Sequence, residues 1–245
     1  MLKIKCAKFL QILNDPEWIR GFLSFNKCFS ISSFHINSAI AKYQSIFHTI
    51  IDGGANKGQF ALAAARRFPM ADIYCFEPIP DVYRDLANNV KKFSKIHPYN
   101  HAVGNMKGKI PFYRHELTPA SSAMAMLENN NRPNCDPQRL NIIEVDILRL
   151  DDFAINYDMR PPVLLKLDVQ GYEKEVLKGA QKTLDRIDYI VLETSFSKLY
   201  ENQPLFDELH EYIKNLGFEL VAPLDVNVGN NHAIIEMDVL YKKNQ

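Results

Sequence analysis

The stretch "IIDGGANKGQF", Ile50 to Phe60, joins a short apolar run to an alanine-rich run with helical spacing. Three glycines, Gly53, Gly54 and Gly58, lie at this join. Glycine permits positive φ and lets a ligand approach the backbone where a Cβ would collide. The helix beyond it offers unpaired N–H groups and a partial positive charge. The stretch therefore predicts a strand, a ligand-binding turn and a helix.

The chain after Thr49 alternates short apolar runs with amphipathic runs. This pattern predicts strands at 49–52, 72–76, 97–103, 163–168, 189–194, 218–222 and 234–241, and helices at 59–67, 80–92, 172–184 and 205–216. Such alternation is typical of right-handed βαβ units and a mainly parallel sheet with helices on both faces. Two further strands, 108–115 and 140–150, flank a long loop rich in Pro, Asn and Ser. The sequence thus predicts a Rossmann-like α/β domain.

The first 48 residues show a different pattern, with apolar residues at helical spacing from Leu2 onward. Asp15 followed by Pro16 is a start signal for a second helix. We expect residues 1–48 to form a helical appendage to a Rossmann-like domain at 49–245. The appendage would cover an edge or face of the core, act as a lid, or hold a homo-oligomer together.

Composition narrows the class of protein. Lys and Arg together number 29, as do Asp and Glu, so no global field draws this 245-residue chain to nucleic acid. No basic stretch is interleaved with aromatic residues. The four cysteines lack metal or disulfide spacing. No apolar run approaches the ~18 residues of a membrane span, and no signal-peptide cleavage site follows the N-terminus, so we expect a cytoplasmic protein.

The spacing of the glycines separates two ligand classes. A dinucleotide site has the pattern G-x-G-x-x-G, but Ala55 or Asn56 stands where its second glycine belongs. The pattern D-x-G-x-N-x-G is instead matched by Asp52, Gly54, Asn56 and Gly58. It resembles the first motif of Rossmann-like methyltransferases that use S-adenosylmethionine. We expect the cofactor to bind at this turn, on Asp52, Gly53, Gly54, Ala55, Asn56 and Gly58.

The ends of the next two strands complete the expected cofactor site. Glu77 follows Gly58 by 19 residues, the distance needed to return to the same sheet edge after one helix and one strand. Its carboxylate can accept hydrogen bonds from both hydroxyls of a ribose, and Pro78 sets the turn into the next helix. At the third strand end, His101, Ala102 and Val103 would lie beside the adenine.

Several stretches together resemble the FkbM family of methyltransferases. They are "IDGGANKGQF", "FEPIP", "NHAVGN", the pair Ser121 and Ser122, "LLKLDVQGYEKEVLKGA" and "IVLETSFSKLY", spread in order from Ile50 to Tyr200. The resemblance implies a seven-stranded sheet whose last strand is antiparallel. It also implies methyl transfer from S-adenosylmethionine, commonly to a hydroxyl of a sugar or other natural product.

The candidate catalytic residues are Asp168 and Glu193, which end two predicted parallel strands and would meet at one sheet edge. Asp168 can be a general base or position the acceptor, or it can contact the methionine ammonium of the cofactor. The two carboxylates can also join a divalent metal site, such as one for Mg²⁺. The alternative without chemistry is that Asp168 caps a helix and Glu193 is solvated.

Other polar residues are further candidates for roles at the site or in the core. His115 is a further candidate base because its unperturbed pKa lies near neutrality. Together with Ser121 and Ser122, it would close over the acceptor. Lys166 lies within an apolar strand, where a buried lysine needs a partner such as a carboxylate in the core, and we interpret it as structural. Glu173 in the first turn of a helix favours the helix dipole.

The predicted function is a methyltransferase that uses S-adenosylmethionine and methylates a hydroxyl of a sugar, polysaccharide or other natural product. Two alternatives stay open: N-methylation of a small molecule or protein, and a cofactor-binding subunit without catalysis.

Overall fold

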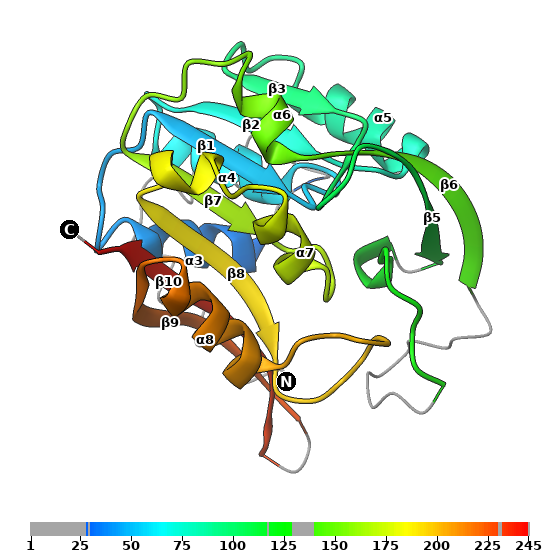
Figure 1. Ribbon diagram of the computed structural model, residues 1–245. Coiled ribbons are helices and arrows are strands. Elements are labelled where there is room, and N and C mark those ends of the chain that lie inside the picture. The colour runs from blue at the N-terminus through cyan, green and yellow to red at the C-terminus, as the bar shows by residue number, and fades with distance from the viewer. Residues whose placement is uncertain (1–27, 29, 117, 129–139, 230–231, 245) are drawn as a thin grey trace.

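The computed structural model describes residues 28, 30–116, 118–128, 140–229 and 232–244 (Figure 1). The larger sheet consists of β1 (Thr49–Gly53), β2 (Asp72–Phe76), β3 (Ile96–Tyr99), β7 (Val163–Leu167), β8 (Tyr189–Ser195), β9 (Phe218–Val228) and β10 (Ile234–Lys243). The smaller sheet consists of β4 (Ala102–Val103), β5 (Gly108–His115) and β6 (Leu140–Leu148). The α-helices are α3 (Ile31–Ile40), α4 (Gln59–Arg67), α5 (Pro80–Val90), α6 (Leu150–Ala154), α7 (Glu173–Lys178) and α8 (Phe206–Asn215).

The larger sheet has the strand order β3-β2-β1-β7-β8-β10-β9. The first five strands in this order are parallel, and β10 runs antiparallel to both of its neighbours. This confirms the predicted seven-stranded, mainly parallel sheet with an antiparallel last strand. The strand order changes direction at β1, which has β2 on one side and β7 on the other. A crevice at the carboxyl ends of strands is expected at such a point.

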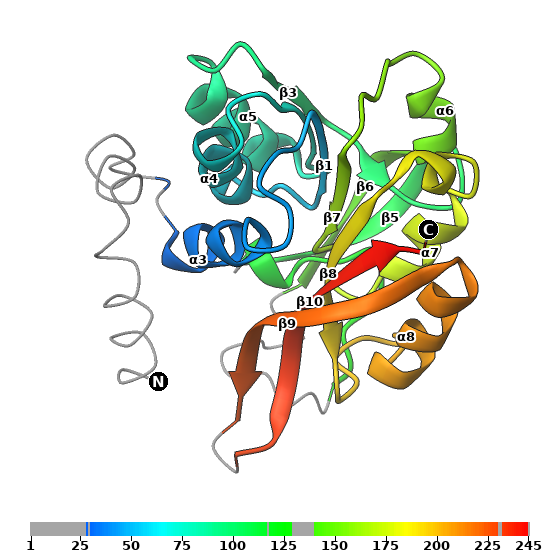
Figure 2. The ribbon, with the colours of Figure 1, turned by 90° about the vertical axis from the view of Figure 1, so that its left-hand side faces the viewer.

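Helices cover both faces of this sheet. Figure 2 shows α3, α4 and α5 on one face and α6, α7 and α8 on the other. Successive strand residues alternate between the two faces, so Ile50 packs with Leu62 of α4 while Ile51 packs with Val176 of α7. Both faces of the central strands are therefore buried, which explains why these strands read as continuous apolar runs.

The third predicted strand, 97–103, is interrupted. Its first part is β3 and its second part is β4, which leaves the larger sheet to pair with β6. At the bend, the side-chain amide of Asn100 donates to the carbonyl oxygens of Glu77 and Pro78, at 2.9 and 3.0 Å. This side-chain to backbone bonding replaces the sheet ladder and turns the chain.

The predicted helix 172–184 is shorter than expected. The α-helix ends at Lys178, and a 3-10 turn, η3 (Thr183–Arg186), follows. A Cβ on Gly179 would lie 1.8 Å from the carbonyl oxygen of Gly104. The two backbones therefore touch at a point where only glycine fits, and the helix stops there.

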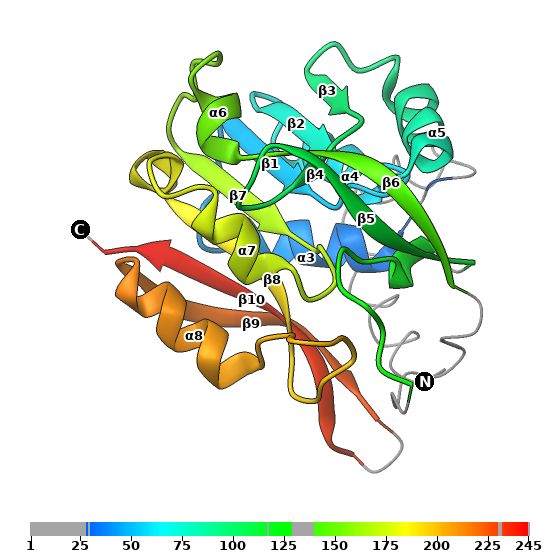
Figure 3. The same cartoon turned by 45° about the vertical axis from the view of Figure 1, so that its right-hand side comes forward.

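The smaller sheet covers the edge of the fold beside α5. Its strands lie on the same side of the molecule as α5 (Figure 3), and their side chains share a core with those of that helix. The residues of this core are Ile79, Val82, Ala102, Ile110, Phe112, Val145 and Ile147. This sheet thereby forms one wall beside the carboxyl ends of β1 and β2.

Within the predicted appendage, the described part is the short helix α3 and the chain that follows it. Ser30 caps α3, because its Oγ accepts a hydrogen bond from the N–H of Ser33 at 3.2 Å. The helix packs against α4 and β9, and Ile40 and Phe47 belong to the same core as α4. This part of the chain covers a face of the sheet. The helix starts predicted at Leu2 and Asp15 lie outside the described residues, and a domain boundary at His48 stays a prediction.

None of the described helices is long and apolar enough to cross a membrane.

A buried acid, Asp151, ties α6 to η3. Its Oδ1 accepts hydrogen bonds from the backbone N–H of Lys182 (3.0 Å) and from the N–H and hydroxyl of Thr183 (both 2.8 Å). Burial opposes ionisation of Asp151, but these hydrogen bonds and the charge of Arg149 outweigh it and hold the pKa below its usual value.

We predict that Asp151→Asn lowers the free energy of unfolding by about 1–3 kcal/mol, because a neutral oxygen is a weaker acceptor for three buried donors. The pKa is lower in the folded chain, so the stabilisation is present above the unfolded value of about 4 and is lost as the pH falls below it. Urea unfolding of wild type and variant between pH 7 and pH 3 measures this. The exposed neighbour provides the control: an equal loss in Asp152→Asn would contradict the assignment.

Candidate functional site

Two cavities meet at the carboxyl ends of the parallel strands. The first lies between β1, β2, β4 and the loop after β7, and the second lies between β7, β8, β10 and α3. Both are lined by Gly54, Asn56, Pro119 and Asp168. These residues form a shared boundary, so a group bound in one cavity borders a group bound in the other.

The glycine turn lies at the boundary between the two cavities. Gly54 has φ of 76°, and a Cβ on it would lie 1.9 Å from the carbonyl oxygen of Asp168. The N–H groups of Gly54 and Ala55 donate to the carbonyl oxygen of Phe76, at 3.1 and 2.9 Å. Only glycine permits both the positive φ and this contact. The turn after β1 is therefore held against the ends of β2 and β7.

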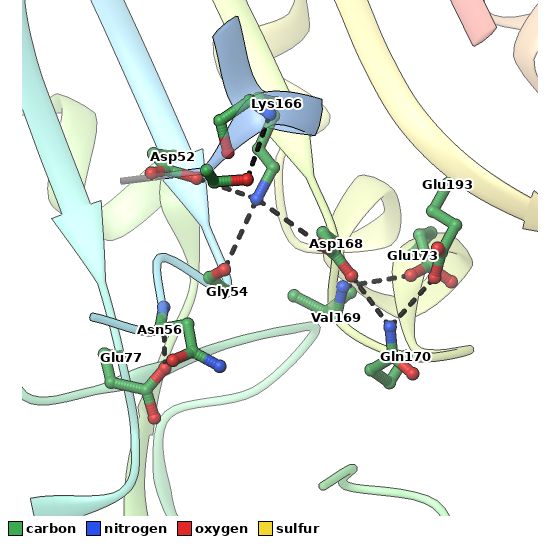
Figure 4. Close-up of polar contacts among 12 residues, drawn as sticks. Asp52, Gly54, Asn56, Glu77, Lys166, Asp168, Val169, Gln170, Glu173 and Glu193 are labelled. Atoms are coloured by element: carbon green, nitrogen blue, oxygen red, sulfur yellow. Dashed lines mark hydrogen bonds and ion pairs between the residues drawn. The ribbon is translucent and has the colours of Figure 1, made fainter. Parts of the chain in front are cut away.

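Glu77 lies in the first cavity with both carboxylate oxygens fixed. Its Oε2 accepts a hydrogen bond from the N–H of Asn56 at 3.0 Å, and its Oε1 accepts one from the N–H of Ile79 at 2.9 Å (Figure 4). The residue is 5% exposed, and burial raises the pKa of its carboxyl to about 7. Each oxygen keeps a further lone pair, so the carboxylate can accept hydrogen bonds from a vicinal diol.

The rest of the first cavity is largely apolar, and its far wall bears the residues predicted to face an adenine. His101, Ala102 and Val103 all line it, together with Phe112 and Tyr172. The Nδ1 atom of His101 is buried and has no hydrogen-bond partner in the described part of the chain. An aromatic base would pack against the apolar side chains of this wall. The cavity thus fits an adenosine as well as a diol.

Lys166 lies beneath the boundary and has the carboxylate partner that the sequence requires. Its Nζ is 3.0 Å from Asp52 Oδ1, 3.3 Å from the carbonyl oxygen of Gly54 and 3.9 Å from Asp168 Oδ2 (Figure 4). Burial alone would lower the pKa of Lys166, but the charges of Asp52 and Asp168 outweigh it and raise the pKa. The cation therefore joins β1, β7 and the glycine turn.

Several residues predicted to bind the cofactor do not line the first cavity. Asp52 is fully buried in its ion pair and lines neither cavity, and Gly53 is likewise enclosed by Leu167 and Val103. Gly58 begins α4 behind the turn. Ala55 lines the second cavity and Pro78 the first. The turn is supported, on the side away from the cavities, by Asp52, Gly53 and Gly58. The buried ion pair and the tight packing leave these residues no surface that a ligand could contact.

Asp168 and Glu193 come together as predicted, and the amide of Gln170 joins them. Gln170 Nε2 donates to Asp168 Oδ1 and to Glu193 Oε2, both at 2.8 Å. Its Oε1 accepts from the hydroxyl of Tyr200 at 2.9 Å, which fixes the orientation of the amide. Sequence reasoning did not single out Gln170. The signal available was its place between Asp168 and Gly171 in the "DVQGYE" stretch.

The bridge by Gln170 bears on the predicted metal alternative. An amide N–H group occupies the position between the two carboxylates that a shared cation would need. Within the described residues, no group of three or more His, Cys, Asp or Glu side chains can hold a metal ion. The described residues around Asp168 and Glu193 therefore give no support to a divalent metal site.

The second cavity is more polar. Its walls are α3, the start of α4 and the ends of β7, β8 and β10, and its lining includes Ser30, Ser32, Ser33, Gln59, Lys166, Asp168, Glu193 and Asp238. Asp238 was not among the predicted site residues. It pairs in register with Glu193 across β10 and β8, a tertiary neighbour that no spacing in the sequence reveals.

The residues predicted to close over an acceptor are placed otherwise. His115 ends β5, is 1% exposed and lines neither cavity. Its N–H donates to Ser121 Oγ at 3.0 Å, and Ser122 Oγ donates to the carbonyl oxygen of Gln170 at 2.7 Å. Because β5 pairs with β6 as far as His115, the imidazole is enclosed, and we assign it no role as a base. Ser121 does line the first cavity.

Glu173 has a more specific position than the start of a helix. Its Oε1 accepts hydrogen bonds from the N–H groups of Val169 and Gly171, at 3.0 and 3.3 Å. Burial raises the pKa of its carboxyl to about 7. Glu173 thereby holds the loop that carries Gln170.

Comparison with known proteins adds a family and several relatives. The Methyltransferase FkbM domain matches residues 52–220. Methyltransferase 1 of Beauveria bassiana is 26% identical over 197 residues, which are 75% of this chain and 75% of that protein. The 2-O-methyltransferase NoeI of Sinorhizobium fredii is 27% identical over 179 residues, 71% of this chain and 73% of that protein. The hexuronic acid methyltransferase AglP of Haloferax volcanii is 22% identical over 143 residues, 58% of this chain and 54% of that protein.

Among solved structures, 1,6-didemethyltoxoflavin-N1-methyltransferase of Burkholderia thailandensis, with bound 1,6-didemethyltoxoflavin and S-adenosylhomocysteine, has a TM-score of 0.48 and 9% identity. The similarity covers 87% of this chain and 79% of that one.

The buried pair under the boundary gives a stability prediction. Removing one partner leaves an uncompensated buried charge, so we expect Lys166→Met and Asp52→Asn each to cost about 3–5 kcal/mol of unfolding free energy. The double variant leaves neither member of the buried pair alone and should cost less than the sum of the two. A double-mutant cycle by urea unfolding measures the coupling. Additive losses would show that the two side chains do not act as a pair.

Proposed function

The chain belongs to the FkbM methyltransferase family, and we propose that it transfers a methyl group from S-adenosylmethionine to a hydroxyl oxygen of a sugar or related natural product. It has the Rossmann-like fold of class I methyltransferases. The observation that carries the proposal is the boundary at Gly54 and Asp168 between a cavity suited to an adenosine and a polar cavity. Relatives named as a 2-O-methyltransferase and a hexuronic acid methyltransferase support a sugar hydroxyl as acceptor.

The residues of the first cavity would hold S-adenosylmethionine. Glu77 would accept the ribose hydroxyls, and His101, Ala102 and Val103 would enclose the adenine. The backbone around Gly54 would face the methionine part, next to the shared boundary. The bound cofactor supplies an electrophilic methyl group on a sulfonium, which is already a good leaving group.

The chain contributes alignment and proton acceptance in the second cavity. Positioning an acceptor oxygen in line with the methyl group can contribute ~7–11 kcal/mol in favourable cases. We assign this positioning to Asp168 and Glu193, whose orientation is fixed by Gln170. Asp168 lies on the boundary and is the candidate general base, since an alcohol loses its proton as the new bond forms. Lys166 and Gln170 hold its carboxylate in place.

Glu77 provides the test of the cofactor site. Calorimetric titration with S-adenosylmethionine and S-adenosylhomocysteine should show binding, whereas NAD should not bind. Glu77→Gln should weaken both by about tenfold to a hundredfold, because hydrogen bonds to the charged carboxylate are lost. The exposed acid of β6 supplies a matched control, Glu144→Gln, which should bind like the wild type. Tight binding of NAD alone would exclude the methyltransferase function.

The raised pKa of Glu77 adds a pH dependence to this titration. The ionised carboxylate is the better acceptor for the ribose hydroxyls, so affinity should fall as the pH is lowered through about 7. The wild type should show this fall and Glu77→Gln should not. A pH profile that is the same in both proteins would remove Glu77 from the binding site.

Asp168 provides the test of the chemistry. With S-adenosylmethionine and simple glycosides, mass spectrometry should find one added methyl per sugar and an equal amount of S-adenosylhomocysteine. Asp168→Asn should lower kcat about a hundredfold or more while S-adenosylhomocysteine binds nearly as before. Asp207→Asn, on the exposed start of α8, is the control. Equal losses of binding and turnover would place Asp168 at the cofactor, and methylation of amines alone would contradict a hydroxyl acceptor.

A further inference from the structure

The second cavity has an unbalanced set of charges. Among the described residues that line it, the ionisable side chains are Lys166, Asp168, Glu193 and Asp238. The one cation of this set lies 3.0 Å from Asp52 and 3.9 Å from Asp168. Its charge is therefore already shared between two carboxylates, and one of them, Asp52, lies outside the cavity. With Asp238 added, the carboxylates around this cation outnumber it.

Adding a further negative charge near Asp238 is unfavourable, because other acidic side chains surround it. It is partly buried on β10, in register with Glu193 on β8 and with Asp225 on β9. In the described part of the chain, no residue donates a hydrogen bond to the side-chain carboxylate of Asp238 or forms an ion pair with it, although its backbone is paired in the sheet. Its carboxylate thus lines the cavity with its acceptor atoms available to a ligand.

The titration of Asp238 reflects the same surroundings. Burial, then the charges of Asp168 and Asp225, raise the pKa of its carboxyl to about 7, against the opposing charge of Lys166. Glu236 on its own strand raises the pKa further, and Glu193 faces it from β8. Since the field around Asp238 already resists one more negative charge, it would also resist an anionic ligand.

The geometry points to an acceptor that is neutral or carries an amino group, and not one that carries a carboxylate. We propose that Asp238 sets this charge selectivity. The inference rests on the proposed methylation of a sugar hydroxyl and narrows its substrate class.

The cavity would attract some acceptors and repel others. Carboxylates accept hydrogen bonds from the hydroxyls of a polyol, and Ser30, Ser32 and Gln59 add neutral hydrogen-bonding groups to the same cavity. An ammonium group would gain from the nearby carboxylates. A uronate would place a like charge beside Asp168 and Asp238 in a partly enclosed space, where such contacts are strongly unfavourable. Specificity here depends on repulsion as well as attraction.

The test compares acceptors that differ at one position only. Methyl glucoside, methyl glucosaminide and methyl glucuronide, with the corresponding galactose and mannose series, are incubated with the full-length enzyme and S-adenosylmethionine, and S-adenosylhomocysteine release gives kcat/KM. We expect the neutral or amino sugar to exceed the uronide by about tenfold or more. A uronide used as well as its neutral partner would overturn the inference and leave the proposed function intact. Turnover of no hydroxyl acceptor, with cofactor binding intact, would overturn both.

A variant isolates the role of Asp238. Asp238→Asn should raise the ratio of uronide to neutral kcat/KM by about tenfold, and the wild-type discrimination should grow as the pH rises through about 7 while that of the variant should not. Glu219→Gln, an exposed acid on β9, removes the same charge elsewhere and should leave the ratio unchanged. A merely structural role of Asp238 would lower activity on all acceptors alike, and that outcome would also overturn the assignment.

Discussion

The ion pair of Lys166 and Asp52 is the interaction on which the rest of the site depends. A lysine in the middle of an apolar strand is costly unless its charge is compensated, and here the compensation comes from the two strands that meet where the sheet order changes direction. The same ammonium group contacts the carbonyl oxygen of Gly54 and approaches Asp168. One buried cation thus fixes the relative positions of the glycine turn and Asp168.

The close contact at Gly54 places the glycine turn directly against Asp168. Since no Cβ separates the turn from the backbone of Asp168, the two backbones are in contact, and both residues line both cavities. Methyl transfer requires donor and acceptor to approach within bonding reach in a shared, water-poor space. On the proposed function, the lack of a side chain at Gly54 lets the turn and Asp168 lie together at the boundary where donor and acceptor would meet.

Much of the fold and cofactor site could be predicted from local signals. The strands at 49–53 and 72–76 are apolar runs beside helical patterns, and the distance from Gly58 to Glu77 follows from chain geometry alone. The break at Asn100, the bridge by Gln170 and the enclosure of His115 depend on contacts between segments distant in sequence, which spacing does not encode. Asp238 is the clearest case, because only strand register brings it beside Glu193. A homo-oligomer through the N-terminal helices stays a prediction.

The residues that line the second cavity come from inside and from outside the family domain. The shared family domain spans residues 52–220, and it contains the glycine turn, Glu77, Asp168 and Glu193. The α3 wall with Ser30 and Ser32 precedes that domain, and Asp238 follows it. On the proposed function, the residues that would hold the methyl donor lie within the family domain, while flanking segments supply part of the cavity that would meet the acceptor. Such a division would let acceptor preference change at the two flanks without disturbing the residues that hold the donor.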